Sequence, residues 1–409
     1  MKLSKFMCAA FAAAMVLAGC NKENETPVDD GSNGFKSCVL QLENVALTKL
    51  PSTDYISNNT AVTLNSFQVF FSAGSNLYQA YESAGTAVAD TYFDSASDDL
   101  TTMKQFHFLP HAVNEVLVIG NFDKIDNLGT VDETGKYSLT RQQLREQINQ
   151  LEIATQQNPK DMKLFGVDQS LEASGGNHNS GGDVNPVYLA KVELKPTVAR
   201  FEITGFNYNL DPETAARKYT SLSIKQLTVR SYFEKATAAV SGESVLTVTG
   251  SQNDAYNENT YPITDGNANA YFNAVNGRGW FADAPNITFE DATDTWSKGN
   301  LTPTTDAPYT AVSEESVLFS YHLFPGQVPQ FLVRLEAQPI TGATEHLYLM
   351  TNSLRKSATE ILLPQDILPG NIYRMAFTFS DGSFEQPEKC IELTVSVAKW
   401  QVNVLTPEF

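Results

Sequence analysis

The stretch VYLAKVELKPTVARFEITGF, residues 187–206, sets the organisation of this chain. Its two parts, VYLAKVEL and VARFEITGF, are rich in β-branched and aromatic residues, as strands are. They meet at Lys195-Pro196, where proline offers no N–H to a sheet and holds the preceding residue extended. The stretch therefore predicts the end of one β domain, 36–195, and the start of a second, 196–398.

Most other apolar runs also predict strands, because they combine β-branched and aromatic residues with period-two alternation and are bounded by turn residues. Alternation with polar residues favours antiparallel sheets that have one covered face. The expected fold is mostly β, with two antiparallel β-sandwich domains in tandem. Two polar stretches, 172–186 and 251–300, are expected to be loops. The predicted strands include 66–73, 115–122, 225–233, 317–325, 330–337 and 372–379.

One amphipathic helix is predicted in the first domain, within SLTRQQLREQINQLEIATQQ, residues 138–157. Thr140 can cap its start, and Gln143 can return the bond that completes a capping box. Leu144, Ile148 and Leu151 would then share one face. A single helix of this kind would pack against a sheet.

The start of the chain predicts a lipoprotein signal peptide, residues 1–19. Two lysines precede an apolar run, 6–18, that is too short to span a bilayer comfortably. The run ends in Leu-Ala-Gly-Cys, a lipobox whose small residues fit a signal peptidase and whose Cys20 thiol would receive acyl groups such as palmitate. Residues 20–35 are polar and acidic and predict a flexible tether.

Composition and motifs argue against nucleic-acid binding and against catalysis. The chain has 409 residues and a formal net charge of −19, which opposes contact with nucleic acid and anionic lipid. No G-x-S-x-G, H-E-x-x-H, Walker or C-x-x-C motif occurs. His107 and His111 are four apart but flank Pro110, so no metal site, cofactor or catalytic residue is expected. His178 is expected to be solvated and His322 half-buried.

Four cysteines occur, and Cys8 and Cys20 are assigned to the signal peptide and the lipid anchor. Cys38 and Cys390 remain, each at the start of a predicted strand. In an exported protein they could form a disulfide, or they could be two separate buried thiols.

The end of the chain, LTVSVAKWQVNVLTPEF at 393–409, changes phase. Apolar positions are odd-numbered up to Val397 and even-numbered at Trp400, Val402 and Val404. A continuous strand with such a slip would turn its apolar face outward unless a bulge or a change of sheet intervened. We therefore expect a separate C-terminal segment, 399–409, with a bulge in one edge strand as the alternative.

Four further stretches carry a recognisable pattern: VLVIGNFDK (116–124), KPTVARFEI (195–203), GNIYRMAFTF (370–379) and IELTVSVAKWQV (391–402). Taken in order with the lipobox, they resemble the fimbrillin family, the subunits of type V pili from the Bacteroidia. In that family the domains are transthyretin-like sandwiches, and Arg is usual where this chain has Lys195.

The resemblance implies a surface-exposed outer-membrane lipoprotein that a trypsin-like protease cuts after its first strand. A C-terminal strand of another fimbrial subunit then fills the vacated groove by strand addition. Here it implies a cut between Lys49 and Leu50 and a donor strand bearing Trp400, Val402 and Val404. The excised strand, 38–46, would carry Cys38, Leu40 and Leu42 on one face.

Other roles remain open at this point. An anchor, or a tip adhesin that binds a host or bacterial surface ligand, would belong to the same family. A surface glycan-binding lipoprotein would instead show exposed aromatic platforms and no cleavage. Asp94-Ser95-Ala96 resembles the O-glycosylation motif of this bacterial group, in which Ser95 would carry the glycan. An unmodified polar turn is the alternative, because the same residues are typical of one.

Overall fold

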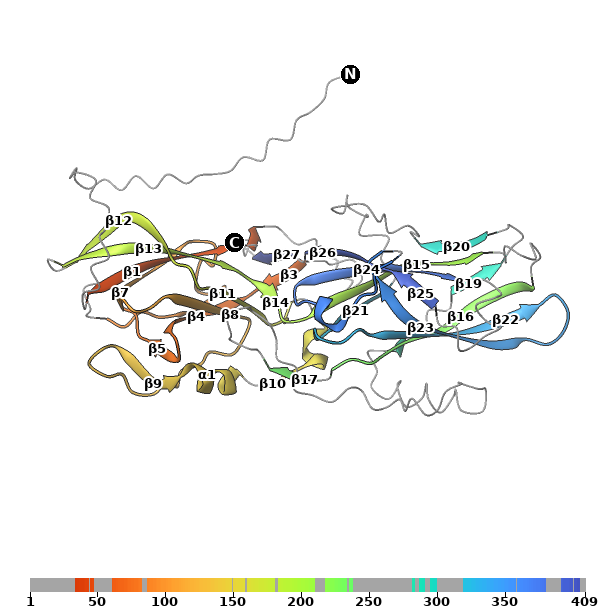
Figure 1. The fold of residues 1–409 in the computed structure, drawn as a ribbon, viewed down its shortest axis with the longest axis horizontal. Helices are drawn as coiled ribbons and strands as arrows, with labels where there is room; N and C mark the ends of the chain where they lie inside the picture. Colours follow the sequence, from red (N-terminus) through yellow and green to blue (C-terminus); the bar gives the residue numbers. More distant parts are fainter. Residues whose placement is uncertain are drawn as a thin grey trace, which may run out of the picture. The chain divides into compact units, whose positions relative to one another are not determined.

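The structure of the chain is a computed structural model, and it covers most of the strands that the sequence predicts. It describes residues 34–43, 45–47, 61–82, 87–148, 150–158, 160–180, 183–209, 218–233, 235–237, 282–283, 287–290, 295–299, 319–357, 359–379, 391–399 and 401–404. Within these ranges, no helix combines the length and the hydropathy needed to cross a membrane. The fold is mostly β, as predicted (Figure 1).

Residues 35–196, here the first half, form a four-stranded sheet and a seven-stranded sheet. The four-stranded sheet contains β1 (Phe35–Glu43), β7 (Lys104–Pro110), β12 (Glu172–Ser180) and β13 (Asp183–Glu193), in the order β12-β13-β1-β7. The seven-stranded sheet runs β14-β11-β8-β4-β5-β9, with β6 against β4. Its strands are β4 (Ser66–Ala73), β5 (Asn76–Tyr78), β6 (Tyr92–Asp94), β8 (Glu115–Gly120), β9 (Lys136–Thr140), β11 (Leu164–Asp168) and β14 (Lys195–Pro196).

The two sheets of the first half enclose an aromatic and aliphatic core. Phe71 of β4 meets Phe106 of β7 edge to face, with ring centroids 4.9 Å apart. The sheets also approach closely at Gly166 of β11, where a Cβ atom would lie 2.5 Å from the Glu193 carbonyl oxygen. Only glycine fits there, so this position fixes how closely β11 packs against β13.

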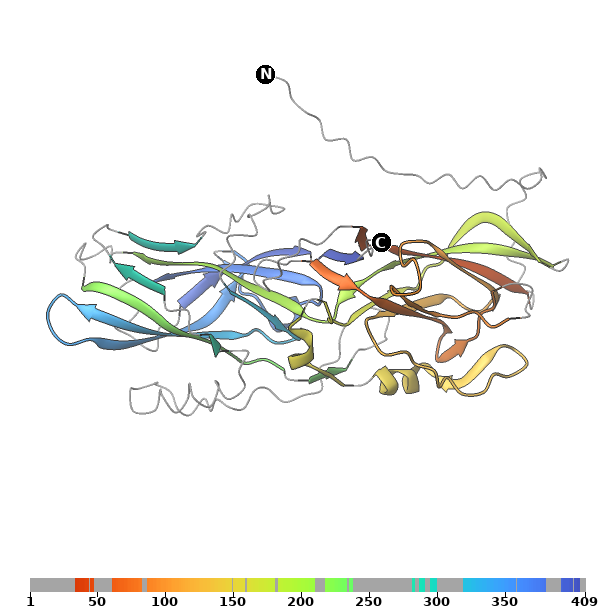
Figure 2. The same cartoon turned by 180° about the vertical axis from the view of Figure 1, so that it is seen from behind.

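Helix α1 (Arg141–Ile148), drawn in yellow in Figure 2, begins with the predicted capping box. The Gln143 N–H donates to Thr140 Oγ1 at 3.2 Å, and Gln143 Oε1 accepts from the Thr140 N–H at 2.8 Å. The helix is shorter than expected, because Leu151 lies in β10 (Gln150–Glu152), which pairs with β17 (Lys235–Thr237). A 3₁₀ turn, η1 (Ile153–Gln156), follows. Pairing with a distant strand thus overrides the helical spacing.

Residues 199–399, the second half, also form two sheets. Aromatic side chains from the two sheets meet between them, where Phe331 and Phe377 pack edge to face with ring centroids 6.1 Å apart. The five-stranded sheet, β20-β15-β24-β26 with β21 against β15, contains β15 (Ala199–Asn209), β20 (Thr295–Gly299), β21 (Phe319–Leu323), β24 (Asn371–Phe379) and β26 (Ser396–Lys399). The six-stranded sheet, β18-β16-β22-β23-β25 with β19 against β16, contains β16 (Tyr219–Arg230), β18 (Ala282–Asp283), β19 (Ile287–Glu290), β22 (Gln330–Pro339), β23 (Glu345–Arg355) and β25 (Ile391–Thr394). A short 3₁₀ turn, η4 (Pro364–Asp366), precedes β24.

The two expected loops are corrected, and the sheets, mainly antiparallel as predicted, also contain parallel pairs. Most neighbouring strands are antiparallel, but β1 runs parallel to β13 and β15 runs parallel to β24. In each half the opening strand lies beside a late one, and the intervening strands provide the long crossover that parallel pairing needs. The expected loop at 172–186 is a hairpin of β12 and β13, with a register shift between Ala173 and Asn177. The expected loop at 251–300 contains β18, β19 and β20, because backbone pairing to β16 and β15 outweighs weak strand propensity.

The phase slip at the end of the chain corresponds to two changes of sheet. β25 pairs with β23, and β26 pairs with β24 in the opposite sheet. Val395 lies between them, buried, and its N–H donates to the Arg355 carbonyl at 2.7 Å. A third segment, β27 (Gln401–Val404), joins another sheet altogether. The end of the chain is therefore three short strands and not one bulged strand.

Candidate functional site

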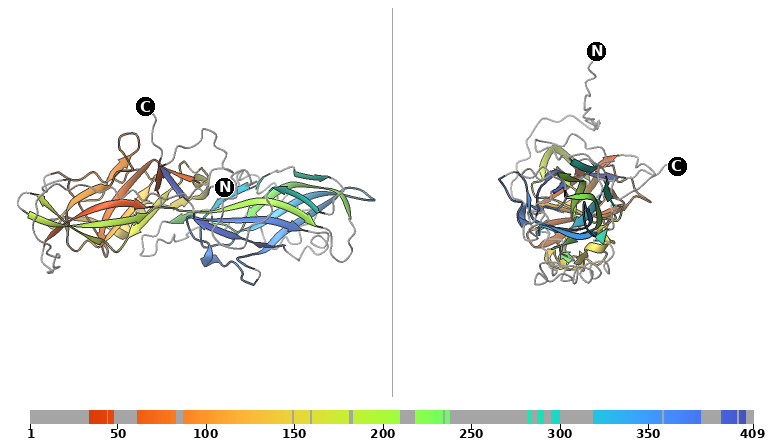
Figure 3. Two further views of the ribbon diagram at one scale, coloured as in Figure 1. Left: turned by 90° about the horizontal axis from the view of Figure 1, so that it is seen from above. Right: turned by 90° about the vertical axis from the view of Figure 1, so that its right-hand side faces the viewer.

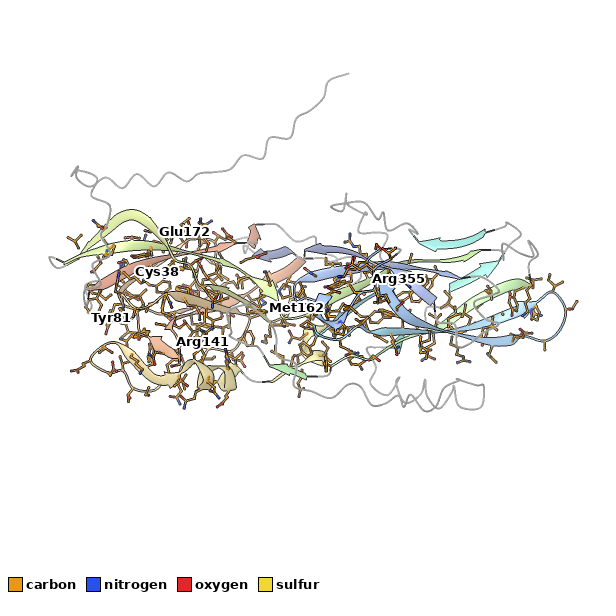
Figure 4. All side chains as sticks on the ribbon, in the orientation of Figure 1. Cys38, Tyr81, Arg141, Met162, Glu172 and Arg355 are labelled. Carbon is orange, nitrogen blue, oxygen red and sulfur yellow. The ribbon has the colours of Figure 1, made fainter. Side chains whose placement is uncertain are left out.

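The first strand, β1, fills a slot between two other strands of its sheet. Cys38 pairs in register with Tyr188 of β13 on one side and with Phe106 of β7 on the other. Cys38 and Leu40 are fully buried, Cys38 lies inside the first half (Figure 4), and Leu42 packs at the edge of the core. The predicted apolar face of this strand therefore covers core residues.

Cys38 is a free, buried cysteine in the structure. Cys390 lies outside the described residues, so a disulfide between the two stays a prediction. Burial raises the pKa of the thiol to about 12, which keeps it protonated and unreactive at neutral pH.

The other face of β1 carries a polar contact. Ser37 Oγ lies 2.9 Å from Nδ1 of His107, on β7. The His107 ring stacks on His178 of β12 with centroids 3.7 Å apart, so the expectation of a solvated His178 is wrong. Burial, with the neighbouring His178, lowers the pKa of His107 to about 4. The imidazole is therefore neutral at physiological pH and needs a hydrogen-bonding partner on β1.

A backbone irregularity lies at the same place. The register between β1 and β7 shifts between Lys36 and Cys38, so two β7 residues face one residue of β1. Phe108 takes a φ of 54°, rare for an aromatic residue, and its ring meets Phe35 edge to face at 5.9 Å. The bulge brings both His107 and Phe108 to the Ser37 face of β1.

The C-terminal segment β27 lies between two strands of the first half. β2 (Val45–Leu47) and β3 (Ala61–Leu64) flank it, and both run parallel to it. Figure 3 shows this end of the chain beside the first strands. Val402 pairs in register with Val45 and Val62, and Val404 pairs with Leu47 and Leu64. Val402 and Val404, two of the predicted donor residues, are thus already paired within the same chain.

The connection that joins β2 to β3, residues 48–60, contains Lys49 and Leu50. These two residues lie outside the described part of the chain, as do Cys20, Cys390 and Trp400. Even so, the order β2-β27-β3 means that any cut in this connection separates the two strands that flank β27.

The Asn121 side chain holds β3, one of the two strands that flank β27, by hydrogen bonds. Its side-chain amide donates to the carbonyls of Thr63 at 2.7 Å and Met162 at 2.8 Å. Its Oδ1 accepts from the Asn65 N–H at 2.7 Å, and its φ of 61° suits asparagine better than most residues. The stretch 116–124 contains this asparagine after a hydrophobic strand, but its role in holding β3 is visible only in three dimensions.

The second half contains a buried polar network that the sequence did not predict. Arg200 Nε donates to Glu202 Oε1 at 2.7 Å, and Arg374 Nε donates to Glu202 Oε2. His322, at 1% exposure, is fully buried and not half-buried as expected. Its Nε2 lies 3.1 Å from Arg200 Nη1, and its Nδ1 lies 2.9 Å from the Gln156 carbonyl oxygen.

These contacts fix the tautomer of His322. A guanidinium can only donate and a carbonyl can only accept, so Nε2 accepts and Nδ1–H donates. Burial, and then the Arg200 charge, lower the pKa of His322 to about 3. The neutral ring therefore links β21 to η1, across the two halves.

We expect this histidine to make the protein sensitive to mild acid. The unfolded chain binds a proton near pH 6.5, whereas folded His322 binds one only near pH 3. Stability is therefore fully present above pH 6.5 and falls as the pH drops through this window. His322→Gln should reduce the slope of the free energy of unfolding between pH 6 and pH 5 by about 1 kcal/mol per pH unit, measured by urea titration. An unchanged slope would contradict the assignment.

Ser95 follows β6 in a tight turn. Asp94 Oδ1 accepts from the Ala96 N–H at 2.8 Å, and the Asp94 carbonyl accepts from the Asp98 N–H at 2.7 Å. Ser95 is half-buried, and its modification stays a prediction.

Among the described residues, no group of three or more His, Cys, Asp or Glu side chains could hold a metal ion.

Comparison with known proteins gives matches among solved structures. No model of a known protein family and no curated protein matches the sequence. A candidate cell adhesion protein from Bacteroides eggerthii DSM 20697 is similar over 91% of this chain and 98% of its own, at 14% identity and a TM-score of 0.47. A fimbrilin from Porphyromonas gingivalis W83 is similar over 91% and 99%, at 11% identity and a TM-score of 0.44. A fimbrial assembly protein from Parabacteroides distasonis ATCC 8503 is similar over 90% and 96%, at 10% identity and a TM-score of 0.31.

Proposed function

We propose that the chain is a structural subunit of a cell-surface fimbria, of the fimbrillin type that its sequence resembles. In this proposal it is exported as an outer-membrane lipoprotein through Cys20, is cut after Lys49 and assembles by strand exchange. The observation that carries the proposal is the position of β27, a C-terminal strand held between two strands of the first half. Such a segment can pair with strands that are distant in sequence, as a donor strand must.

A cut after Lys49 would have two effects, because both β1 and β2 precede it in the chain. Cleavage after Lys49 detaches residues up to 49, which include both β1 and β2. Loss of β1 exposes the backbone edges of β13 and β7 together with the core that Cys38 and Leu40 cover. Loss of β2 leaves β27 paired only with β3. One cut would therefore open an acceptor slot and loosen the donor strand at the same time.

Keeping both strands in place before the cut also limits aggregation. An open strand edge is a template for unwanted pairing, and β1 and β2 close such edges in the uncut chain. The acidic composition, a formal net charge of −19 for the full chain with its two signal-peptide lysines included, would further keep the exported precursors apart. The partners in this scheme are other fimbrial subunits, a trypsin-like protease and the outer membrane, with a host or bacterial surface ligand for the assembled fimbria.

Replacement of Lys49 by glutamine tests the proposal. We expect filaments shed from cells to begin at Leu50 in the parent protein, and Lys49→Gln to abolish them, because the protease requires a basic residue. Lys124→Gln, which removes an exposed lysine elsewhere in the first half, serves as the control and should leave filaments unchanged. N-terminal sequencing and electron microscopy provide the two measurements. Filaments whose subunits begin at Cys20 would refute the cut, and a surface protein that begins at Cys20 without filaments would favour an anchor, a tip adhesin or a glycan binder.

A further inference from the structure

We propose that His107 and His178 form a clasp over the first strand, which holds β1 in place at neutral pH and opens in mild acid. Such a clasp would act in the uncut chain and does not require strand exchange. Three features of the four-stranded sheet support it: the strands from which the two rings come, the curl that lets the rings meet, and the uncharged surroundings of the pair.

The two histidines come from the two outer strands of their sheet. The strand order is β12-β13-β1-β7, so β13 and β1 separate His178 on β12 from His107 on β7. In a flat sheet three strand spacings would put these outer strands about 14 Å apart. The two ring centroids lie only 3.7 Å apart, and the rings are nearly parallel, at 18°. The sheet therefore curls so that the side chains of its outer strands meet above β13 and β1.

Two irregularities of the backbone permit this curl. The register of β12 against β13 shifts between Ala173 and Asn177, and the register of β1 against β7 shifts between Lys36 and Cys38. Bulges of this kind bend a strand and increase its local twist. Figure 1 shows the hairpin of β12 and β13 arched in this way. The curl brings the hairpin over the face of β1 that carries Ser37.

Each of the four strands contributes one polar side chain at this contact. Ser37 of β1 bonds to His107 of β7, and Asn185 of β13 pairs in register with His178 of β12. Ser37, His107 and Asn185 are at most 6% exposed. The first strand is thus tied directly to the ring pair, so separation of the two rings would free the Ser37 face of β1.

The closed cluster accommodates a positive charge on either ring poorly. His178 Nε2 and Asn185 Nδ2 are buried without a hydrogen-bond partner. A charged imidazole donates from both ring nitrogens, so protonation of His178 would bury an N–H that has no acceptor. Two charged rings at stacking distance would also repel each other. Uptake of protons therefore favours the open arrangement, in which water solvates both rings.

The contacts of the surrounding ionisable groups do not offset such a charge. The Glu172 carboxylate is paired with Lys191 at 2.7 Å, and the Lys36 ammonium lies 4.6 Å from the centre of the Tyr188 ring. None of these contacts supplies an anion to the rings, and burial, with His178, holds the pKa of His107 at about 4. The groups on the elements around the pair include Lys36 on β1, Glu172 on β12, Tyr188 and Lys191 on β13, and Tyr81 and His111 beside β7.

The direction of the pH dependence follows from this difference. Opening of the clasp exposes His107 to water, where an imidazole has a pKa near 6.5, whereas the closed arrangement takes up the proton only near pH 4. Closure is therefore fully favoured above pH 6.5 and weakens as the pH falls toward 4. Between pH 7.5 and pH 5 the equilibrium constant for opening should rise about thirtyfold.

Hydrogen exchange of the uncut protein, followed by mass spectrometry of peptides from β1, β12 and β13, measures this opening. After correction for the intrinsic exchange rate at each pH, protection in these strands should fall about thirtyfold between pH 7.5 and pH 5. β8, in the other sheet of the first half, should stay better protected at each pH, as a local opening requires. Equal protection of β1 and β8 would mean global unfolding and would overturn the clasp. A fall in β12 and β13 that leaves β1 unchanged would overturn its role in holding β1.

His107→Gln isolates the titration of this ring. Glutamine can still bond to Ser37 Oγ but takes up no proton, so the fall in protection should shrink to about threefold or less. His107→Phe, which keeps an aromatic ring against His178, should give the same result and serves if the glutamine variant does not fold. His111→Gln removes an imidazole that contacts Tyr188 outside the stack and should leave the fall at about thirtyfold. A His107→Gln protein with the full pH dependence of the parent would show that this ring does not control the opening.

Discussion

Glu202→Ala should lower the free energy of unfolding by about 3–5 kcal/mol, the range found when one partner of a buried ion pair is removed. Glu202 is fully buried and binds two guanidinium groups, those of Arg200 and Arg374. Burial lowers the pKa of Arg200, and the neighbouring Glu202 carboxylate acts in the opposite direction and favours the charged guanidinium. Removal of Glu202 would leave two cations in the core without their shared counter-charge. Urea unfolding followed by tryptophan fluorescence measures the change.

A surface ion pair provides the matched control. Lys356 Nζ lies 3.0 Å from Glu360 Oε1, and the Glu360 side chain is 62% exposed. Exposed pairs contribute at most about 1 kcal/mol, so Glu360→Ala should have a small effect. If the two alanine variants were equally stable, the buried network would not hold the second half together as described.

Leu40→Ala should destabilise the uncut protein by about 2–5 kcal/mol, as for other fully buried leucines. Leu40 is 1% exposed and belongs to β1, so its loss leaves a cavity between the sheets of the first half. If β1 is excised before assembly, the same substitution should leave filaments made from cut protein unaffected. The measurements are urea unfolding of the uncut chain and thermal dissociation of the filaments.

Val62→Ala separates these two effects. Val62 is also fully buried, but it belongs to β3, which stays in the chain after a cut at Lys49. It should therefore weaken uncut protein and filaments alike. Filaments that Leu40→Ala weakens as much as Val62→Ala does would mean that β1 is retained in the assembled subunit.

Sequence patterns predicted a helix or strand correctly where all the residues that stabilise it lie within one short segment of the chain. The Thr140–Gln143 capping box forms as its spacing requires, because both partners lie in one turn of chain. The helix end was misplaced because the partner of β10 is β17, which lies far along the chain. The same cause explains the hairpin at 172–186, where strand pairing outweighs local propensity.

The buried network shows the limit of alternation as a guide. In VARFEI, Arg200 and Glu202 alternate with Ala199, Phe201 and Ile203, which predicts a polar face turned to solvent. The structure buries that face, because β21 and β24 flank β15 and bring His322 and Arg374 against it. Nothing local to 199–203 specifies those partners.

The sequence by itself determined that this chain is mostly β, where helix α1 begins, and that its end divides where the apolar phase slips. Each of these depends on side-chain periodicity or on groups a few residues apart. Tertiary structure alone decided that β1 lies between β13 and β7, that His107 faces Ser37, and that β27 lies between β2 and β3. Those arrangements depend on which strand edges meet, and edges far apart in the chain carry no local signal of their partners.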